Sequence, residues 1–169
     1  MLVKLKLPIW EGTYKSANQG EIKDFNLFFN EKINLIQQKY VSKIFYEDKD
    51  YSFITLPPGS SAYANKIGDS YIRRISKFIK GREIHNVLEI GAGSDYIAKG
   101  IYKNNKYNSA TLIDPALRIN FSRKIQTIKS YYPSAKIEHQ KYDFIYSINT
   151  LEHVLNPKKF LMQVRKNIT

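Results

Sequence analysis

Residues 86–95 read NVLEIGAGSD, and this stretch decides the fold. Its first half is an apolar run typical of a buried strand, and the run ends at the glycine pair Gly91 and Gly93. Glycine lets the backbone approach a ligand closely because it has no Cβ. The N–H groups at the start of the following helix favour an electron-rich ligand in the same space. The pattern therefore predicts a strand, a ligand-binding turn and a helix.

A second apolar run, residues 111–113, ends in Asp114, 23 residues after Gly91. A strand closed by an acid, following a strand, a glycine turn and a helix, is typical of a nucleotide-cofactor site, where the acid holds ribose hydroxyls. An alternative interpretation makes Asp114 the cap of a helix that begins at Pro115. The dinucleotide pattern G-x-G-x-x-G/A ends here in Tyr96, which argues against NAD or FAD.

Two motifs, in order, resemble those of class I S-adenosylmethionine-dependent methyltransferases. The stretch VLEIGAGS at 87–94 is similar to the first motif of that family, and YDFIYSINTLEHV at 142–154 is similar to its fourth-strand motif. An Asn156-Pro157 pair and an amphipathic helix follow, as they do in the family. The resemblance implies an α/β, Rossmann-like, doubly wound fold with a mainly parallel sheet, and S-adenosylmethionine as the cofactor.

The resemblance also implies roles for individual residues. The glycine turn would lie against the methionine part of the cofactor, Glu89 near its ammonium, and Asp114 at its ribose. Asp95 replaces the family's third glycine, where it either leans toward the positive groups of the cofactor or crowds the site. The expected cofactor-binding residues are Glu89, Gly91, Ala92, Gly93, Ser94, Asp95, Asp114, Asn149 and Leu151.

Methyl transfer to an oxygen or carbon nucleophile needs a general base. Glu152 and His153 follow the fourth strand at its carboxyl end, where ligands bind in open α/β sheets, so they are the candidate catalytic residues. The alternative is a structural role for this pair. Three of the 13 tyrosines are candidates for contact with the substrate: Tyr14, Tyr63 and Tyr96.

Alternation of strand and helix patterns predicts a parallel sheet with right-handed crossovers. Asp69 or Ser70 is expected to cap a helix that runs to about Lys80 and ends at Gly81. The further elements expected are strand 86–90, helix 95–104, strand 109–113, helix 115–130, strand 134–138, strand 142–147 and helix 157–167.

Residues 1–60 are expected to form a small α+β N-terminal extension or lid, and residues 61–169 the cofactor-binding core, with a turn or linker at 57–61. Residues 2–10 suit an edge strand, whereas 24–46 suits either a helix or short strands. Parts of 29–53 weakly resemble the zinc module of some sugar C-methyltransferases. Asn30 and Ile33 stand at the cysteine positions of that module, so no metal is expected.

Two further departures from the family concern the adenine loop and the number of strands. A third strand near 136–138 leaves only 139–141 for the loop that holds adenine in the family. The chain stops after the fourth of the family's seven strands, so we expect a truncated sheet. Its fourth strand would be an open edge, available to a missing part or a protein partner.

Composition narrows the class of protein. The chain is 43% apolar, and its longest apolar runs are too short to span a membrane. It has no cysteine, which excludes disulfides and thiolate metal sites and agrees with a cytoplasmic location. Its net charge of +12 points either to a nucleic-acid partner or to A/T-rich codons, which also specify the abundant Asn, Ile and Tyr. A basic cluster at 73–82 fits the solvated face of a helix.

Three functions therefore remain open. The first is a methyltransferase that acts on a small molecule, such as a nucleotide sugar or another polysaccharide precursor. The second is a nucleic-acid methyltransferase or binder, supported by the charge and weakened by the absence of an Asn/Asp-Pro-Pro-Tyr motif. The third is a truncated, non-catalytic methyltransferase-like subunit that needs a partner along its fourth strand.

Overall fold

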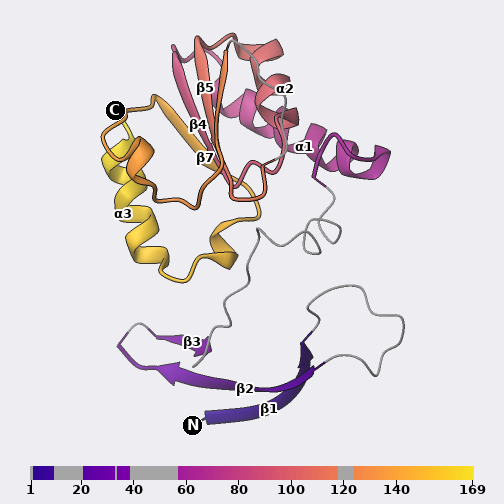
Figure 1. Cartoon of the computed structure of the whole chain (residues 1–169), viewed down its shortest axis with the longest axis vertical. Coiled ribbons are helices and arrows are strands. Elements are labelled where there is room, and N and C mark those ends of the chain that lie inside the picture. The colour runs from indigo at the N-terminus through magenta and orange to yellow at the C-terminus, as the bar shows by residue number, and fades with distance from the viewer. Residues whose placement is uncertain (1, 10–20, 33, 39–56, 118–123) are drawn as a thin grey trace. The chain divides into compact units, whose positions relative to one another are not determined.

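The computed structural model of this chain describes residues 2–9, 21–32, 34–38, 57–117 and 124–169. The chain divides into two compact units, Met1–Thr55 and Leu56–Thr169 (Figure 1). The assignment of residues 1–60 as a lid and of residues 61–169 as the cofactor-binding core remains a prediction.

The first unit contains an antiparallel sheet in the order β1-β2-β3. Its strands are β1 (Leu2–Ile9), β2 (Glu21–Asn30) and β3 (Leu35–Gln38). The edge strand expected at 2–10 is confirmed over β1, and the described part of 24–46 forms strands rather than a helix. Cross-strand partners share a face of the sheet, so Val3 lies beside Leu27 and Leu5 beside Phe25. Apolar side chains therefore gather on one face.

The side chain of Asn30 stabilises the turn between β2 and β3 through two hydrogen bonds. Its side-chain amide donates to Oε1 of Gln37 at 2.8 Å, and its Oδ1 accepts from the N–H of Lys32 at 3.1 Å. Trp10, Tyr14, Ile33 and the stretch 44–53 that was compared with a zinc module lie outside the described residues. Within the described ranges, no cluster of three or more His, Cys, Asp or Glu side chains could hold a metal.

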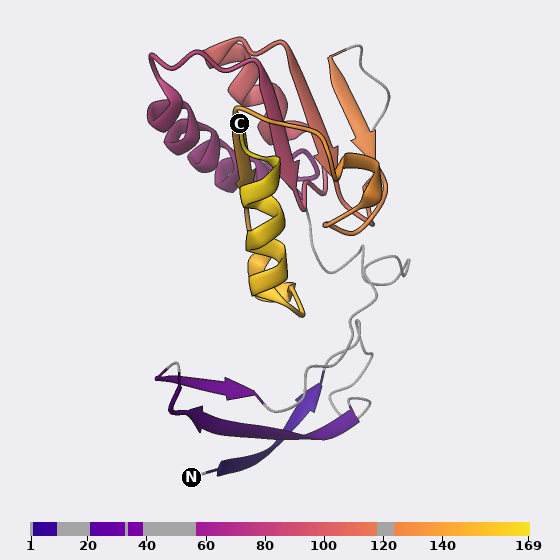
Figure 2. The same cartoon turned by 90° about the vertical axis from the view of Figure 1, so that its left-hand side faces the viewer.

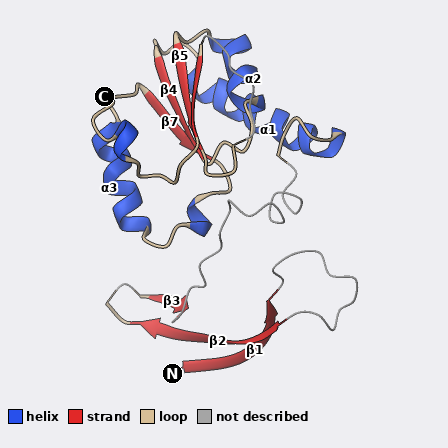
Figure 3. Cartoon of the chain, viewed as in Figure 1, coloured by secondary structure: helices blue, strands red, loops and turns tan. Residues whose placement is uncertain are grey.

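The second unit is built on a four-stranded sheet in the order β6-β5-β4-β7, with every neighbouring pair parallel (Figure 3). Its strands are β4 (Asn86–Ile90), β5 (Ser109–Ile113), β6 (Ile125–Ile128) and β7 (Phe144–Ser147). This order confirms the Rossmann-like topology in which the first strand lies between the second and the fourth. All four carboxyl ends therefore meet at one edge, where α/β proteins bind ligands.

Helices cover both faces of the sheet (Figure 2). Side chains alternate along β4, so Val87 packs toward α1 (Ala62–Ile79) and α2 (Tyr96–Asn105), whereas Leu88 and Ile90 pack toward α3 (Pro157–Asn167). α1 and α2 touch closely, because the side chain of Ile72 fills the space that a Cβ at Gly100 would need. Three of the expected elements, strands 86–90 and 109–113 and helix 157–167, have the predicted bounds.

The start of α1 was predicted wrongly. The helix begins at Ala62, and Ser61 caps it by accepting the N–H of Ala64 at 3.1 Å. Neither Asp69 nor Ser70 is at the start of the helix. The predicted end is confirmed, since the helix stops at Ile79 and Gly81 has a positive φ of 78°. The basic residues of α1 that belong to the 73–82 cluster are exposed, as expected for a solvated face: Arg73, Arg74 and Lys77.

Two predictions between β5 and β7 were also wrong. The helix expected over 115–130 is replaced at its C-terminal end by strand β6, while 118–123 lie outside the described residues. The strand expected over 134–138 is a short 3₁₀ helix, Ala135–Ile137. The third strand therefore ends at Ile128, and residues 129–143 connect it to β7.

A buried amide joins α3 to this connection. Asn167 is fully buried, and its Nδ2 donates to the carbonyl oxygens of Ile137 and Gln140, both at 2.8 Å. The backbone oxygen of Asn167 accepts from the N–H of Tyr142 at 2.8 Å, which places Ile168 beside Tyr142 in a parallel bridge. No helix among the described residues is long and apolar enough to cross a membrane.

Candidate functional site

The glycine turn lies at the carboxyl edge of the sheet, between β4 and α2. Gly91 and Gly93 have φ angles of 75° and 59°, in the left-handed region that favours glycine. The N–H of Gly91 donates to the carbonyl of Ile113 at 2.8 Å, which ties the turn to the end of β5. The turn expected from the sequence therefore forms, and it lies directly before the start of α2.

Asp114 lies against this turn. Its Oδ2 accepts from the N–H of Gly93 at 3.1 Å, and its Oδ1 accepts from the N–H of Ala116 at 2.6 Å. Burial raises the pKa of Asp114, and the two backbone hydrogen bonds oppose that rise. The bond to Ala116 stabilises a local turn, as in the capping interpretation, but each carboxylate oxygen retains a lone pair for a further donor.

Glu89 is an acid inside the core and is 3% exposed. It is the second-last residue of β4, two residues before Gly91. Its Oε2 accepts the phenolic proton of Tyr146 at 2.7 Å. Burial raises the pKa of Glu89 to about 8, although the hydrogen bond from Tyr146 works in the opposite direction. The carboxyl group is therefore largely protonated at neutral pH and would ionise beside a cation.

The segment 57–61 covers the glycine turn, a role that the sequence did not predict. Ser94 donates from Oγ to the carbonyl of Pro58 at 2.6 Å, and a Cβ on Gly93 would lie 3.3 Å from Cβ of Pro57. Pro58 also fits against Gly68, where an added Cβ would come within 2.7 Å of it. A glycine inside a helix often marks a close approach by another part of the chain. Gly68 was therefore the feature of the sequence that could have indicated this contact.

Two residues at the start of α2 interact with side chains of the protein. Asp95 occupies the cap position without a capping hydrogen bond, and its carboxylate pairs with Nζ of Lys99 at 2.6 Å. Tyr96 donates its phenolic proton to Oδ1 of Asp69 at 2.8 Å, which binds α2 to α1. Tyr63, the other described tyrosine among the substrate candidates, is 76% exposed in the first turn of α1.

The loop after β7 lies beside the glycine turn. Thr150 occupies the space next to Gly91, where an added Cβ would overlap the threonine side chain. The preceding residue, Asn149, is exposed and has a positive φ of 50°. Leu151 is 42% exposed and begins the 3₁₀ helix Leu151–His153, which carries the two candidate catalytic side chains. Thr150 was not expected from the sequence to be part of the site.

Glu152 and His153 lie on the exposed surface of this 3₁₀ helix. The N–H of His153 donates to the carbonyl of Thr150 at 3.0 Å, which closes the turn. Both residues follow the carboxyl end of β7, as expected. Their role as a general base remains a prediction.

The region available for adenine differs from the expectation. Because β6 ends at Ile128, the residues at the carboxyl end of the third strand are 129–131. Tyr131 there is 42% exposed. The expectation that only 139–141 remain for the adenine loop assumed a third strand at 136–138, and it is therefore wrong. His139 and its neighbours instead lead into the amino end of β7, at the opposite edge of the sheet.

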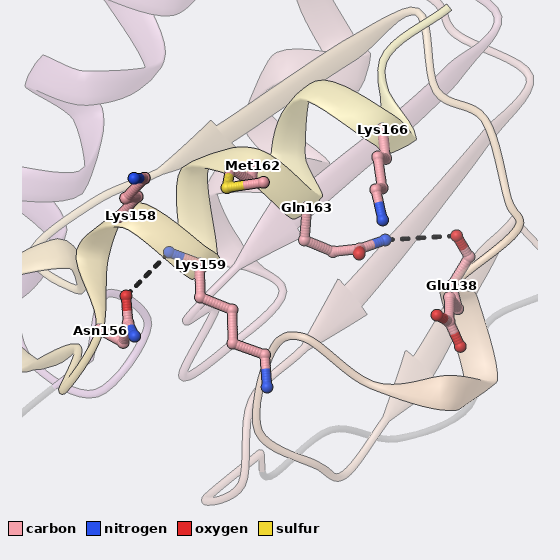
Figure 4. Close-up of a pocket in the computed structure, with 7 residues that line it drawn as sticks. All are labelled: Glu138, Asn156, Lys158, Lys159, Met162, Gln163 and Lys166. Atoms are coloured by element: carbon pink, nitrogen blue, oxygen red, sulfur yellow. Dashed lines mark hydrogen bonds between the residues drawn. The ribbon is translucent and has the colours of Figure 1, made fainter.

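A hollow of about 360 Å³ lies along α3 (Figure 4). Gln163 donates to the carbonyl of Glu138 at 3.3 Å, and Asn156 accepts from the N–H of Lys159 at 2.9 Å. Dashed lines mark both hydrogen bonds in Figure 4. The residues that line the hollow are Glu138, Asn156, Lys158, Lys159, Met162, Gln163 and Lys166. It contains none of the residues expected to bind the cofactor.

Comparison with known proteins gives one family match. Residues 63–168 match a family described as a methyltransferase domain. No curated protein matches the chain.

Several solved structures resemble part of the chain. The plantazolicin methyltransferase BpumL in complex with a monoazolic desmethylPZN analog and SAH is 18% identical, with a TM-score of 0.47, over 64% of this chain and 50% of that chain. BpumL with SAH is 19% identical, with a TM-score of 0.45, over 66% of this chain and 51% of that one. A putative type II methyltransferase from Anaeromyxobacter dehalogenans is 12% identical, with a TM-score of 0.45, over 59% and 42%. The chain thus spans about half the length of BpumL.

Proposed function

The chain belongs to the methyltransferase-domain family, which it matches over residues 63–168, and from this premise we propose that it transfers a methyl group from S-adenosylmethionine to a small molecule. The family match and the parallel sheet agree with the resemblance to class I S-adenosylmethionine-dependent methyltransferases and their Rossmann-like fold. The cofactor, the residues that bind it and the identity of the methyl acceptor are the proposed parts.

One observation carries the proposal: the N–H of Gly93 lies 3.1 Å from Oδ2 of Asp114. A turn that can follow the methionine part of the cofactor and an acid that can hold its ribose are therefore neighbours at the carboxyl edge of the sheet. We assign the methionine side to the turn 91–94 and the ribose to Asp114. Asn149 and Leu151 line the floor in this proposal.

The chemistry of Glu89 fits the cofactor's ammonium. A carboxyl group buried with one phenolic partner is costly to ionise in isolation, and a cation within about 4–6 Å would favour its charged form. Asp95 is already paired with Lys99, so we assign it a weaker, long-range influence. We place adenine near Tyr131, which follows the carboxyl end of the third strand and is 42% exposed.

The bound cofactor would supply an electrophilic methyl group on its sulfonium. The protein's part is to align an acceptor with that methyl group and, for oxygen or carbon acceptors, to remove a proton. His153 and Glu152, on the turn after β7, are the proposed proton acceptors. A nucleotide sugar or another polysaccharide precursor is the proposed acceptor, on the weak N-terminal resemblance to sugar C-methyltransferases.

Calorimetric titration with S-adenosylhomocysteine, the product form of the cofactor, tests the proposal. We expect the unmodified chain to bind, and Asp114→Asn to bind at least tenfold more weakly because two charged hydrogen bonds to the ribose become neutral ones. Asp143→Asn is the matched control. It makes the same change at the opposite end of the sheet, where Asp143 accepts from the N–H groups of His85 and Asn86 at 2.9 and 2.8 Å.

Two results would contradict the proposal. The absence of heat at millimolar ligand would remove cofactor binding altogether. Equal weakening by the Asp114 and Asp143 variants would show that the loss reflects general stability, and the ribose assignment would then fail.

A further inference from the structure

The loop that leaves β7 is fastened to the residue that precedes the glycine turn. The hydroxyl of Ser147 donates to the carbonyl oxygen of Ile90 at 2.9 Å. The hydroxyl of Thr150 lies 3.3 Å from the same oxygen and 3.0 Å from the carbonyl oxygen of Ile148. Two hydroxyl groups, one from the last residue of β7 and one from the loop after it, therefore converge on the carbonyl oxygen of the last residue of β4.

Packing reinforces this attachment. The side chain of Thr150 lies where a Cβ on Gly91 would be, so the absence of a side chain at Gly91 accommodates a neighbour in the chain. Asn149 reaches this arrangement by adopting a positive φ of 50°, a conformation that asparagine tolerates better than most residues. The contact thus depends on both segments, on the glycine that follows β4 and on the residue with positive φ in the loop after β7.

We propose that Thr150, together with Ser147, is a positioning residue for methyl transfer. This inference rests on the proposed function. The glycine turn would hold the methyl donor, and the 3₁₀ helix Leu151–His153 would face the acceptor. Thr150 fixes their separation, because its side chain holds the turn while its carbonyl accepts the N–H of His153 at 3.0 Å. A displacement of about 1 Å at a reacting centre can lower a rate by roughly 10²-fold, so such a fixed separation matters.

The first test compares two substitutions at one position. Thr150→Val keeps the shape of the side chain and removes the hydroxyl, whereas Thr150→Ser keeps the hydroxyl. We expect the valine variant to bind S-adenosylhomocysteine about fivefold more weakly, because the glycine turn is no longer held in place before the ligand binds, and the serine variant to stay within about twofold of the unmodified chain. Isothermal titration calorimetry measures both.

Thr169→Val is the matched control, since the hydroxyl of Thr169 donates to the carbonyl of Tyr142 at 2.8 Å, at the amino end of β7. It loses a comparable bond without touching the glycine turn, so its affinity for S-adenosylhomocysteine should not change. Equal affinity in all four proteins would overturn the positioning role and leave the proposed function intact. Absence of binding by the unmodified chain would remove the proposed function and this inference together.

A second test needs no ligand. Gly91→Ala should strongly destabilise the chain, and the same change should cost much less in a Thr150→Gly background, where only the cost of a positive φ at alanine remains. Urea unfolding of the two single variants and the double variant gives the coupling. Folding of the double variant where Gly91→Ala alone fails to fold would support the contact, and additive effects of the two changes would overturn it.

Discussion

Glu89, on β4, and Asp143, directly before the neighbouring strand β7, are carboxyl groups whose surroundings move their pKa values in opposite directions. Burial raises the pKa of Glu89 to about 8. The N–H groups of Asn86 and His85 hold the pKa of Asp143 below its ordinary value. Asp143 is thus an ionised acceptor that holds the start of β4 at the amino end of the sheet. Glu89 is a mostly neutral group at the carboxyl end, where the proposed cofactor site lies.

The buried carboxyl of Glu89 predicts a pH-dependent stability. Between about pH 4.5 and pH 8 the folded chain holds a proton on Glu89 that the unfolded chain releases, so this contribution to stability is complete below pH 4.5 and is lost as pH rises toward 8. Glu89→Gln cannot ionise. The unmodified chain should therefore lose stability relative to this variant as pH rises, which urea unfolding at several pH values measures.

Glu138→Gln makes the same substitution at an exposed site in the same unit and should leave the pH profile unchanged. If the difference between the unmodified chain and Glu89→Gln were constant from pH 5 to 8, the carboxyl group of Glu89 would already be charged in the folded chain.

Ligand binding at Glu89 should release a proton. If the cofactor's ammonium lies beside this carboxyl, the cation lowers its pKa, and near pH 7 binding releases up to about one proton. Titrations with S-adenosylhomocysteine in phosphate and in Tris should then give different heats, because the two buffers take up protons with different enthalpies. Equal heats in the two buffers would place the ammonium elsewhere, and Glu89→Gln should show equal heats in any case.

At the scale of elements, the start of α1 depends on one side chain. Ser61 caps the helix by accepting the N–H of Ala64. Ser61→Ala should lower the free energy of unfolding by about 1 kcal/mol, whereas Ser61→Asp should retain the cap. Thermal or urea unfolding measures both. A larger loss from Ser70→Ala, at the position predicted from the sequence, would contradict this assignment.

Elements with a strong local pattern could be predicted from the sequence. β4 and β5 are nearly continuous apolar runs, because helices cover both of their faces, and α3 begins with Asn156 and Pro157. β6 has no such pattern: only Ile125 and Ile128 are buried, and the two residues between them are exposed. That spacing resembles a helix, which explains the erroneous helix over 115–130.

The predictable part of the candidate site follows from the same local patterns. Parallel strands bring their carboxyl ends together, so Asp114 could be expected beside the glycine turn. The contacts of Thr150 with Ile90 and of Ser94 with Pro58 join residues 60 and 36 positions apart. No local pattern predicts such pairs, because they arise only when the loops fold over the edge of the sheet.

At the scale of the whole molecule, the exposed cations on the helices of the second unit lie on opposite faces of its sheet. Exposed cations of α1 include Arg73 and Arg74, and those of α3 include Lys158 and Lys159. α1 and α3 cover different faces of the sheet (Figure 2). Among the described residues of the second unit, the cations on α1 and α3 therefore do not form a single basic surface of the kind that binds a duplex tightly.

We accordingly expect weak, nonspecific binding to nucleic acid. A retardation assay with duplex DNA should show any shift only at low salt, and the shift should vanish near 150 mM because few phosphates are neutralised at once. Retention of a sharp complex at that salt concentration would instead support the nucleic-acid function that the composition left open.

Gly68 limits how this protein could be engineered for heat resistance. Exchanging a glycine inside a helix for alanine is a common stabilising substitution, worth about 1 kcal/mol where the neighbourhood is open. Here the new methyl would come within 2.7 Å of Cβ of Pro58 and 3.1 Å of Cδ1 of Tyr96. Gly68→Ala should therefore lower the melting temperature, as differential scanning calorimetry would show, and a rise would mean that the proline segment can retreat without loss. Glycine is ordinarily a poor residue for the middle of a helix, but at position 68 the closeness of Pro58 leaves room for no larger one.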